Sequence, residues 1–183
     1  MHARIPSQHP IDPQQPLDSF AQCHAGITRQ LEALGALPEL ARAAQRARDV
    51  AAGTEALFRD AVVEHHAEEE KDLFPAVLRS AAPGEERALV ASMVQRLTAE
   101  HRAVEALWER LRPGVRLAAQ GRPVDLDVVL VRQLVRGYLQ HAKFEEEHFL
   151  PLAATVLRRD GNHVAALALA LHLRHVPQPV GYI

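Results

Sequence analysis

The sequence predicts an all-α protein: a four-helix bundle that runs up-down-up-down, with an additional short C-terminal helix. Three observations support this fold class. Aromatic residues make up only 4% of the chain, a composition that favours helices over sheets. Apolar residues recur three and four positions apart over long stretches, and no stretch alternates as a half-buried strand does. Gly- and Pro-containing segments separate these stretches.

Four stretches carry the helical pattern, and each is expected to form one helix of the bundle. They cover about residues 17–34, 39–81, 85–112 and 125–159. Asp18 or Ser19 is a suitable N-cap for the first helix, and Gly35 to Pro38 is expected to end it. Gly53 is expected to bend or interrupt the second helix, and Pro113-Gly114 is expected to interrupt the third.

The length of 183 residues favours one main domain. We expect a flexible N-terminal arm at 1–16, a four-helix domain at 17–160, and a C-terminal helix and tail at 161–183. The formal net charge of −2 argues against an electrostatic grip on nucleic acid or an anionic membrane. The single cysteine allows no intrachain disulfide, and no apolar run is long enough to span a bilayer. These features predict a cytoplasmic protein.

One short motif occurs twice in the chain. The copies read HHAEEEKDLFP, beginning at His65, and HAKFEEEHFLP, beginning at His141. Each copy holds a histidine and a glutamate four residues apart, His65 with Glu69 and His141 with Glu145. On an α-helix this spacing places both side chains on one face, about 5–6 Å apart at Cβ. Each copy can therefore provide one side of a metal site.

A single histidine lies on the predicted helix upstream of each copy. These are His24 and His101, 77 positions apart, while His65 and His141 are 76 positions apart. Such a repeat predicts approximate two-fold symmetry, in which two halves supply equivalent ligands to two metal ions. The expected metal ligands are His24, His65, Glu69, His101, His141 and Glu145.

Four imidazoles and two carboxylates suit intermediate first-row metals such as iron, manganese or zinc. A carboxylate can bridge two ions while each ion takes terminal histidines. This ligand set cannot fill two octahedra, so positions remain for water, hydroxide or an external ligand. On redox-active ions those positions could take dioxygen, nitric oxide or peroxide, whereas zinc would normally close a four-coordinate site.

These residues resemble the hemerythrin-like, HHE cation-binding family, whose signature is H…HxxxE…H…HxxxE on a four-helix bundle. The six expected ligands fill the signature in order, over roughly residues 17–158. Each HxxxE is followed by the family's LFP-type ending, here Leu73-Phe74-Pro75 and Phe149-Leu150-Pro151. The resemblance implies a non-haem di-iron centre bridged by two carboxylates and oxygen.

The chain departs from the family's oxygen carriers on the third helix. Those carriers have an extra histidine there, giving HxxxH. In this chain the residue four after His101 is Glu105, and the residue four before it is Leu97. The missing fifth histidine argues against reversible oxygen carriage and leaves Glu105 as a candidate seventh ligand.

Two further histidines allow other interpretations. His66 points about 100° away from His65 on a helix and is expected at the surface, although a shifted register would pair it with Glu70. His148 lies three residues after Glu145, which makes the Glu-x-x-His of ferritin-like di-iron proteins. The first copy has no histidine at that place, so the symmetric HxxxE interpretation is preferred.

The sequence thus predicts a di-iron protein that binds or reacts with a small oxidant in sensing, redox chemistry or stress response. The expected cofactor is two iron ions, with manganese or zinc as alternatives. The expected partner is a diatomic or peroxide ligand, with no nucleic acid and no membrane. Two other classes remain open: ferritin-like iron storage or oxidase activity, and a helical module with structural metal that unfolds on chelation.

Overall fold

The computed structural model describes the backbone of residues 15–159 and side chains from residue 23 onward. Every regular element in that range is helical and none is a strand, so the all-α prediction is confirmed. None of these helices is both long and apolar enough to cross a membrane. The predicted C-terminal helix and tail, and the arm before residue 15, lie outside the described residues. The chain divides into two compact units between Arg46 and Ala47.

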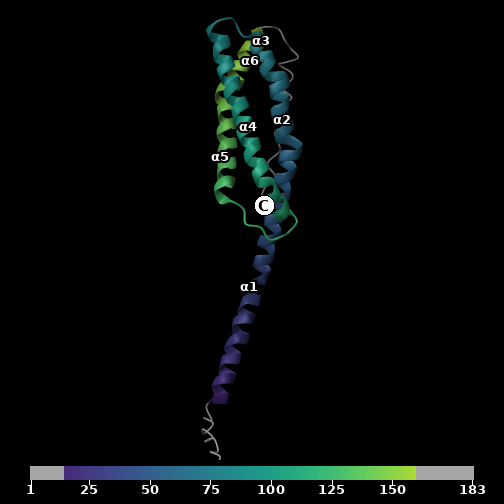
Figure 1. Ribbon diagram of the computed structural model, residues 1–183, viewed down its shortest axis with the longest axis vertical. Coiled ribbons are helices and arrows are strands. Elements are labelled where there is room, and N and C mark those ends of the chain that lie inside the picture. The colour runs from purple at the N-terminus through teal and green to yellow at the C-terminus, as the bar shows by residue number, and fades with distance from the viewer. Residues whose placement is uncertain (1–14, 160–183) are drawn as a thin grey trace, which may run out of the picture. The chain divides into compact units, whose positions relative to one another are not determined.

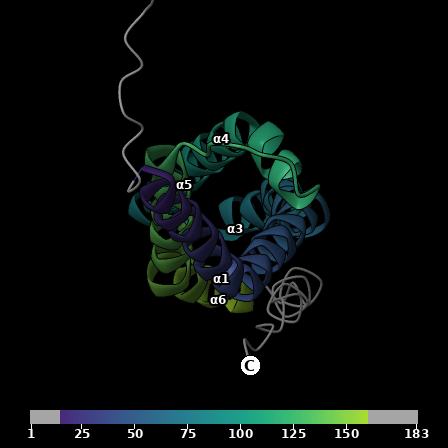
Figure 2. The ribbon, with the colours of Figure 1, turned by 90° about the horizontal axis from the view of Figure 1, so that it is seen from below.

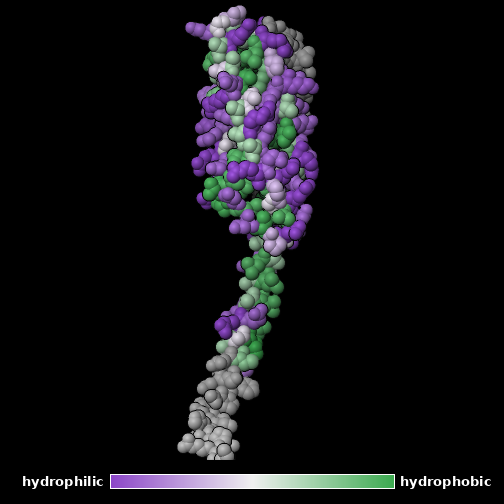
Figure 3. Space-filling view, viewed as in Figure 1, coloured by the Kyte–Doolittle hydropathy of each residue, from purple (hydrophilic) through white to green (hydrophobic). Residues whose placement is uncertain are grey.

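Helix α1 runs from Gln15 to Leu57 and crosses the boundary between the units. Its part in the first unit carries a series of exposed large apolar side chains, which Figure 3 shows as hydrophobic colour along the helix. They are Ile27, Leu31, Leu34, Leu37 and Leu40. The first three lie in residues 17–34, the stretch expected to form the first helix.

The predicted break between the first and second helices is wrong. Helix α1 continues through Gly35 to Pro38 and also through Gly53. A proline removes only one helical hydrogen bond, and the surrounding Ala, Leu, Arg and Glu residues are strong helix formers. Helix α4, Glu85–Ala119, likewise continues through Pro113-Gly114. The described chain therefore has three long helical stretches, and the four-helix up-down bundle is not confirmed.

Within the described residues, the second unit contains three helical stretches, and Figure 1 and the end-on view of Figure 2 show that they run antiparallel. The end of α1 continues without a break into further helix, which ends at Ser80. The second stretch is α4, and the third begins with α5 at Val128. The first stretch continues from α1 through η1 (Phe58–Val62), α2 (Val63–Glu68), η2 (Glu69–Leu73) and α3 (Phe74–Ser80). The third stretch consists of α5 (Val128–Phe144), η3 (Glu145–Phe149) and α6 (Leu150–Arg159).

Local signals explain where α4 and α5 begin. Gly84 precedes α4 with a positive φ of 98°, a conformation that favours glycine. Glu86 in the first turn of α4 accepts a hydrogen bond from the backbone N–H of Ala82 at 2.7 Å. Asp127 caps α5 by accepting from the N–H groups of Val129 at 2.9 Å and Leu130 at 3.1 Å.

The elements η2 and η3 are π-helical turns that occupy the same place in the two motif copies. The N–H of Phe74 donates to the carbonyl of Glu69, and the N–H of Leu150 donates to that of Glu145, each five residues back. The next residue in each copy is a proline, which has no N–H to donate and whose ring crowds the preceding turn. Each helix is thus widened from its motif glutamate onward, with a proline just beyond the widened turn.

Two apolar clusters form the core of the second unit. One includes Leu73, Phe74, Val77, Leu97 and Phe149. The other includes Phe58, Val62, Val104, Trp108 and Leu134. On each helical stretch, the buried histidines and glutamates lie between a residue of one cluster and a residue of the other. The polar residues are thus enclosed at both ends by apolar layers, which exclude water and lower the local dielectric.

Candidate metal centre

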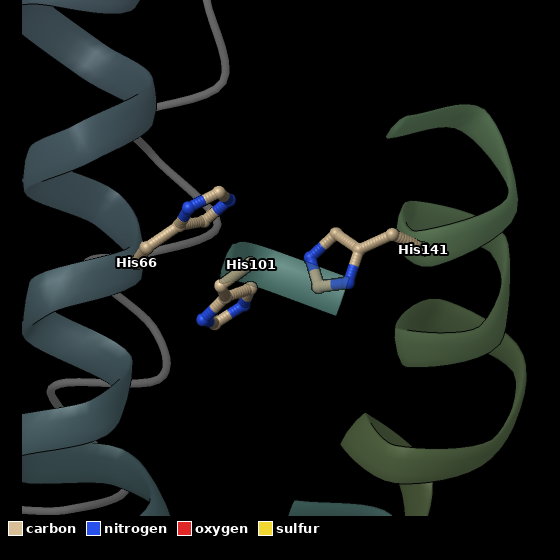
Figure 4. A group of neighbouring side chains, drawn as sticks. All are labelled: His66, His101 and His141. Atoms are coloured by element: carbon tan, nitrogen blue, oxygen red, sulfur yellow. The ribbon is translucent and has the colours of Figure 1, made fainter. Parts of the chain in front are cut away.

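Three histidines converge between the two apolar clusters. His66 comes from α2, His101 from α4 and His141 from α5, and Figure 4 shows the three rings pointing toward one another. All three are buried, and one ring nitrogen of each lies within 4.8 Å of those of the others. The rings of His66 and His101 stack with centroids 3.9 Å apart. This packing brings three potential metal donors to one point.

A carboxylate holds the outward nitrogen of each of these rings. The Nδ1 atom of His66 lies 3.1 Å from Glu105 Oε1, and that of His101 lies 2.9 Å from Glu70 Oε1. In the same way, the Nδ1 atom of His141 lies 3.2 Å from an oxygen of Glu100. Because an ionised carboxylate only accepts hydrogen bonds, Nδ1 is the donor in each pair.

The Nε2 atoms of the three rings point inward. Each is buried and makes no hydrogen bond. A neutral imidazole whose Nδ1 donates presents a lone pair at Nε2, and the Nε2 of His101 lies 3.2 Å from Glu69 Oε2. A cation placed between the Nε2 lone pair and the carboxylate oxygen would be attracted by both. This arrangement of inward Nε2 and carboxylate-bound Nδ1 is typical of histidines that bind metals.

A second group of candidate ligands lies beside the first and contains His65, Glu69 and Glu145. Glu69 faces both groups, because its Oε1 is 3.6 Å from His65 Nε2 and its Oε2 approaches His101. Glu145 Oε2 is 3.8 Å from His141 Nε2. Both carboxylates therefore lie where they can contact ions held by either group.

Burial controls the protonation of these side chains in the metal-free protein. It lowers the pKa of His66 to about 4, with a further lowering by His101, and it also lowers the pKa of His141. These imidazoles are therefore neutral at pH 7, as metal ligation requires. Burial raises the pKa of Glu69 to about 7, and a hydrogen bond with Glu145 opposes the rise only in part.

The structure brings together five of the six residues expected from the sequence: His65, Glu69, His101, His141 and Glu145. The sixth, His24, has an exposed side chain and belongs to the first unit. Its role as a ligand stays a prediction.

The expectation that His66 lies at the surface is wrong. Its side chain is 1% exposed, whereas that of His65 is 24% exposed. Helices in a bundle bury a stripe at least about 100° wide, so two adjacent residues can both face the interior. The doubled histidine of the first copy, which the second copy lacks, was the available signal. His66 thus supplies a third clustered imidazole that the third helix does not provide.

The structure does not place Glu105, Glu70 or His148 in the ligand positions that the sequence left open for them. Glu105 binds the outward nitrogen of His66 rather than joining the inner group. Glu70 binds His101, so the shifted register that pairs it with His66 is not formed. His148 is exposed, with its ring 5.2 Å from that of Phe144. Its side chain belongs to neither group of candidate ligands.

Comparisons with known proteins agree with this chemistry. The family model described as the hemerythrin HHE cation binding domain matches residues 15–153. A protein of Haemophilus influenzae, described as uncharacterized, is 24% identical over 169 residues, which cover 85% of this chain and 95% of that protein. No solved structure gives a significant match.

Proposed function

Because the chain belongs to the hemerythrin HHE cation-binding family, we propose that it is a non-haem di-iron protein that binds or reacts with dioxygen, nitric oxide or peroxide. One observation carries the proposal most directly. The three buried Nε2 atoms of His66, His101 and His141 make no hydrogen bond, while a carboxylate fixes the opposite nitrogen of each ring. Histidines held in this way are prepared to bind a metal ion.

The donor set fits two iron ions. His66, His101 and His141 would hold one ion, and His65 would contribute to the other. Glu69 and Glu145 belong to the second group and also approach His101 and His141 of the first, so each could contribute to both ions. Imidazole with carboxylate is a ligand combination that suits iron.

Four imidazoles and two carboxylates offer fewer donor atoms than two six-coordinate ions need. Positions would therefore remain for water or a small oxidant, and bound iron would supply the redox chemistry. The apolar clusters at both ends of the site would keep bulk water away. His65 is the most exposed residue of the two groups, which makes its side the natural approach for a small molecule. We propose a cytoplasmic role in sensing, redox chemistry or stress response.

The proposal is tested by elemental analysis of protein purified without added metal, with visible spectra before and after azide. We expect close to two irons per chain and charge-transfer bands that azide alters. The variant His101→Ala should lose most of the iron, because it removes a buried donor. The variant His148→Ala is the matched control and should keep it, because His148 is exposed.

Other outcomes would decide against the proposal. A colourless protein that contains zinc would favour a structural metal. Equal iron loss in His101→Ala and His148→Ala would contradict the proposed position of the metal site.

The role of His24 is a separate question, tested by His24→Ala. If His24 is a ligand, we expect this variant to retain clearly less than two irons per chain, and unchanged iron content would exclude it.

A further inference from the structure

A single arginine connects two of the three histidines to each other through their carboxylates. Arg102 follows His101 on α4. One arm of its guanidinium, Nη2, contacts Glu70 Oε2, the carboxylate that binds His101. The other arm, Nη1, lies 3.1 Å from an oxygen of Glu105, the carboxylate that binds His66. We infer that Arg102 is a positioning residue that orients His66 and His101 for metal binding through Glu70 and Glu105.

The inference rests on the proposed function and on the chemistry of the guanidinium group. A guanidinium is planar and presents several N–H donors in a fixed fork, so it can hold two carboxylates at once. Glu70 and Glu105 come from different elements, η2 and α4, and without Arg102 two negative side chains would stand beside each other. Movement of either one would release a Nδ1 atom and let the ring turn.

His141 has a separate support of the same kind. Its carboxylate partner, Glu100, accepts a hydrogen bond from Arg96 Nε at 2.7 Å. The guanidinium of Arg96 also lies over the ring of Phe144, 3.6 Å from its centroid. Arg96 serves one histidine, whereas Arg102 serves two. Loss of Arg102 is therefore expected to disturb the site more than loss of Arg96.

Stability and positioning can be separated because Arg102 is 58% exposed. Ion pairs of exposed side chains add little to folding, so removal of Arg102 should leave the metal-free protein intact. Arg112 provides a matched control on the same helix. It is 52% exposed and pairs with a glutamate three residues away, Glu109, at 3.4 Å, as Arg102 pairs with Glu105. Arg112 makes no contact with the carboxylates that bind the histidines.

The test compares Arg102→Gln, Arg96→Gln and Arg112→Gln with the wild-type chain. Cobalt(II) is the probe, because its visible spectrum reports the geometry of its ligands. Affinity is measured by competition with a chromogenic chelator, and the melting temperature is measured without metal. We expect Arg102→Gln to weaken cobalt binding by about 10- to 100-fold, the range typical of residues that support metal ligands. Its cobalt spectrum should also change, while Arg112→Gln should match the wild type.

A conservative variant tests the two-armed contact. Arg102→Lys keeps the charge but not the fork, and we expect it to recover only part of the lost affinity. Full recovery would overturn the idea that Arg102 links two carboxylates. Equal affinities for Arg102→Gln and Arg112→Gln would overturn the inference, as would a fall in metal-free melting temperature that accounts for the weaker binding. A wild-type chain that binds no cobalt would overturn the proposed function as well, which distinguishes the two failures.

Discussion

The adjacent residues His65 and His66 show how much one position on a helix changes a side chain's surroundings. His66 is almost fully buried, stacks on His101 and has its Nδ1 bound to Glu105. His65 is partly exposed and faces Glu69 across 3.6 Å. The two histidines belong to different groups of candidate ligands. The repeat predicted two equivalent halves, but the three-histidine group and the carboxylate-rich group are chemically unequal.

We expect His66→Ala to lower iron content at least as much as His65→Ala. His66 is one of three clustered imidazoles and has a preset inward nitrogen, whereas His65 is partly exposed. Iron per chain after identical purification checks this, with His148→Ala as the exposed control. Wild-type iron content in His66→Ala would exclude it as a ligand and restore the register expected from the sequence.

At the scale of elements, the π-helical turns η2 and η3 set the direction of the motif glutamates. Each π-turn begins at the motif glutamate, and a proline lies two residues after the last residue of the π-turn. A π-turn inserts an extra residue per turn, so it rotates the residues on either side relative to each other. The π-turn therefore changes the angle between the motif glutamate and the apolar ending that follows it.

We expect Pro75→Ala to weaken metal binding without destabilising the metal-free protein. The alanine restores a backbone N–H, so η2 can relax to an α-helix and turn Glu69 away from the site. Pro113→Ala is the control, because Pro113 also lies inside a helix but has no π-turn beside it. Chelator competition and thermal unfolding check this. Equal metal affinities for both variants would show that the proline does not maintain the turn.

The start of α5 gives a prediction about stability alone. Asp127→Ala removes the acceptor for two backbone N–H groups and is expected to cost about 1 kcal/mol of unfolding free energy. Asp125→Ala, two residues earlier and outside the helix, should be close to neutral. Urea unfolding of the metal-free proteins measures both. Equal losses would place the helix start nearer Asp125, as the sequence indicated.

At the scale of the whole molecule, metal binding and folding should be coupled through the buried carboxylates. Burial raises the pKa of Glu69 to about 7, above its ordinary value of 4.5. Between these values the metal-free folded chain keeps a proton that the unfolded chain has lost. The contribution of Glu69 to stability is therefore complete below about pH 4.5 and is lost as the pH rises to about 7. A bound metal ion would remove this loss by favouring the carboxylate.

We expect the stabilisation by zinc to grow between pH 5 and pH 7.5. At pH 5 Glu69 is protonated in the folded chain, so metal binding must displace that proton. As the pH rises past about 7 the carboxylate loses its proton, so metal binding no longer has to displace it. The difference in melting temperature with and without zinc measures this effect, and zinc avoids redox complications. A metal concentration of 100 times Kd would add about 2.7 kcal/mol. A difference that does not change with pH would contradict the coupling.

The pH dependence of folding stability contains contributions of opposite sign from Glu69 and His66. The variant Glu69→Gln removes the contribution of the Glu69 carboxylate alone. Burial lowers the pKa of His66 to about 4, so its contribution to stability rises as the pH increases from about 4 to 6.5. Glutamine cannot lose a proton, so metal-free Glu69→Gln should lack the decline between about pH 4.5 and 7. An identical pH profile for variant and wild type would show that Glu69 does not titrate in this range.

The apolar periodicity of the sequence determined the helical class, and the repeated motif determined most of the candidate site. Side chains four residues apart on a helix share a face, so His65 with Glu69 and His141 with Glu145 could be paired without coordinates. The family follows from the same residues, and the match over residues 15–153 shows it. These features depend on local geometry, which a sequence carries directly.

Tertiary structure decided the features that depend on several helices at once. Helix propensity could not show that α1 continues through Pro38, because a proline can either end a helix or remain inside it. Spacing could not show that His66 is buried, since the width of a buried face depends on the neighbouring helices. The carboxylates that hold His66, His101 and His141 are 31 to 41 residues away in sequence. Only packing brings such distant residues together, and so only the structure identifies the layer of carboxylates around the candidate metal ligands.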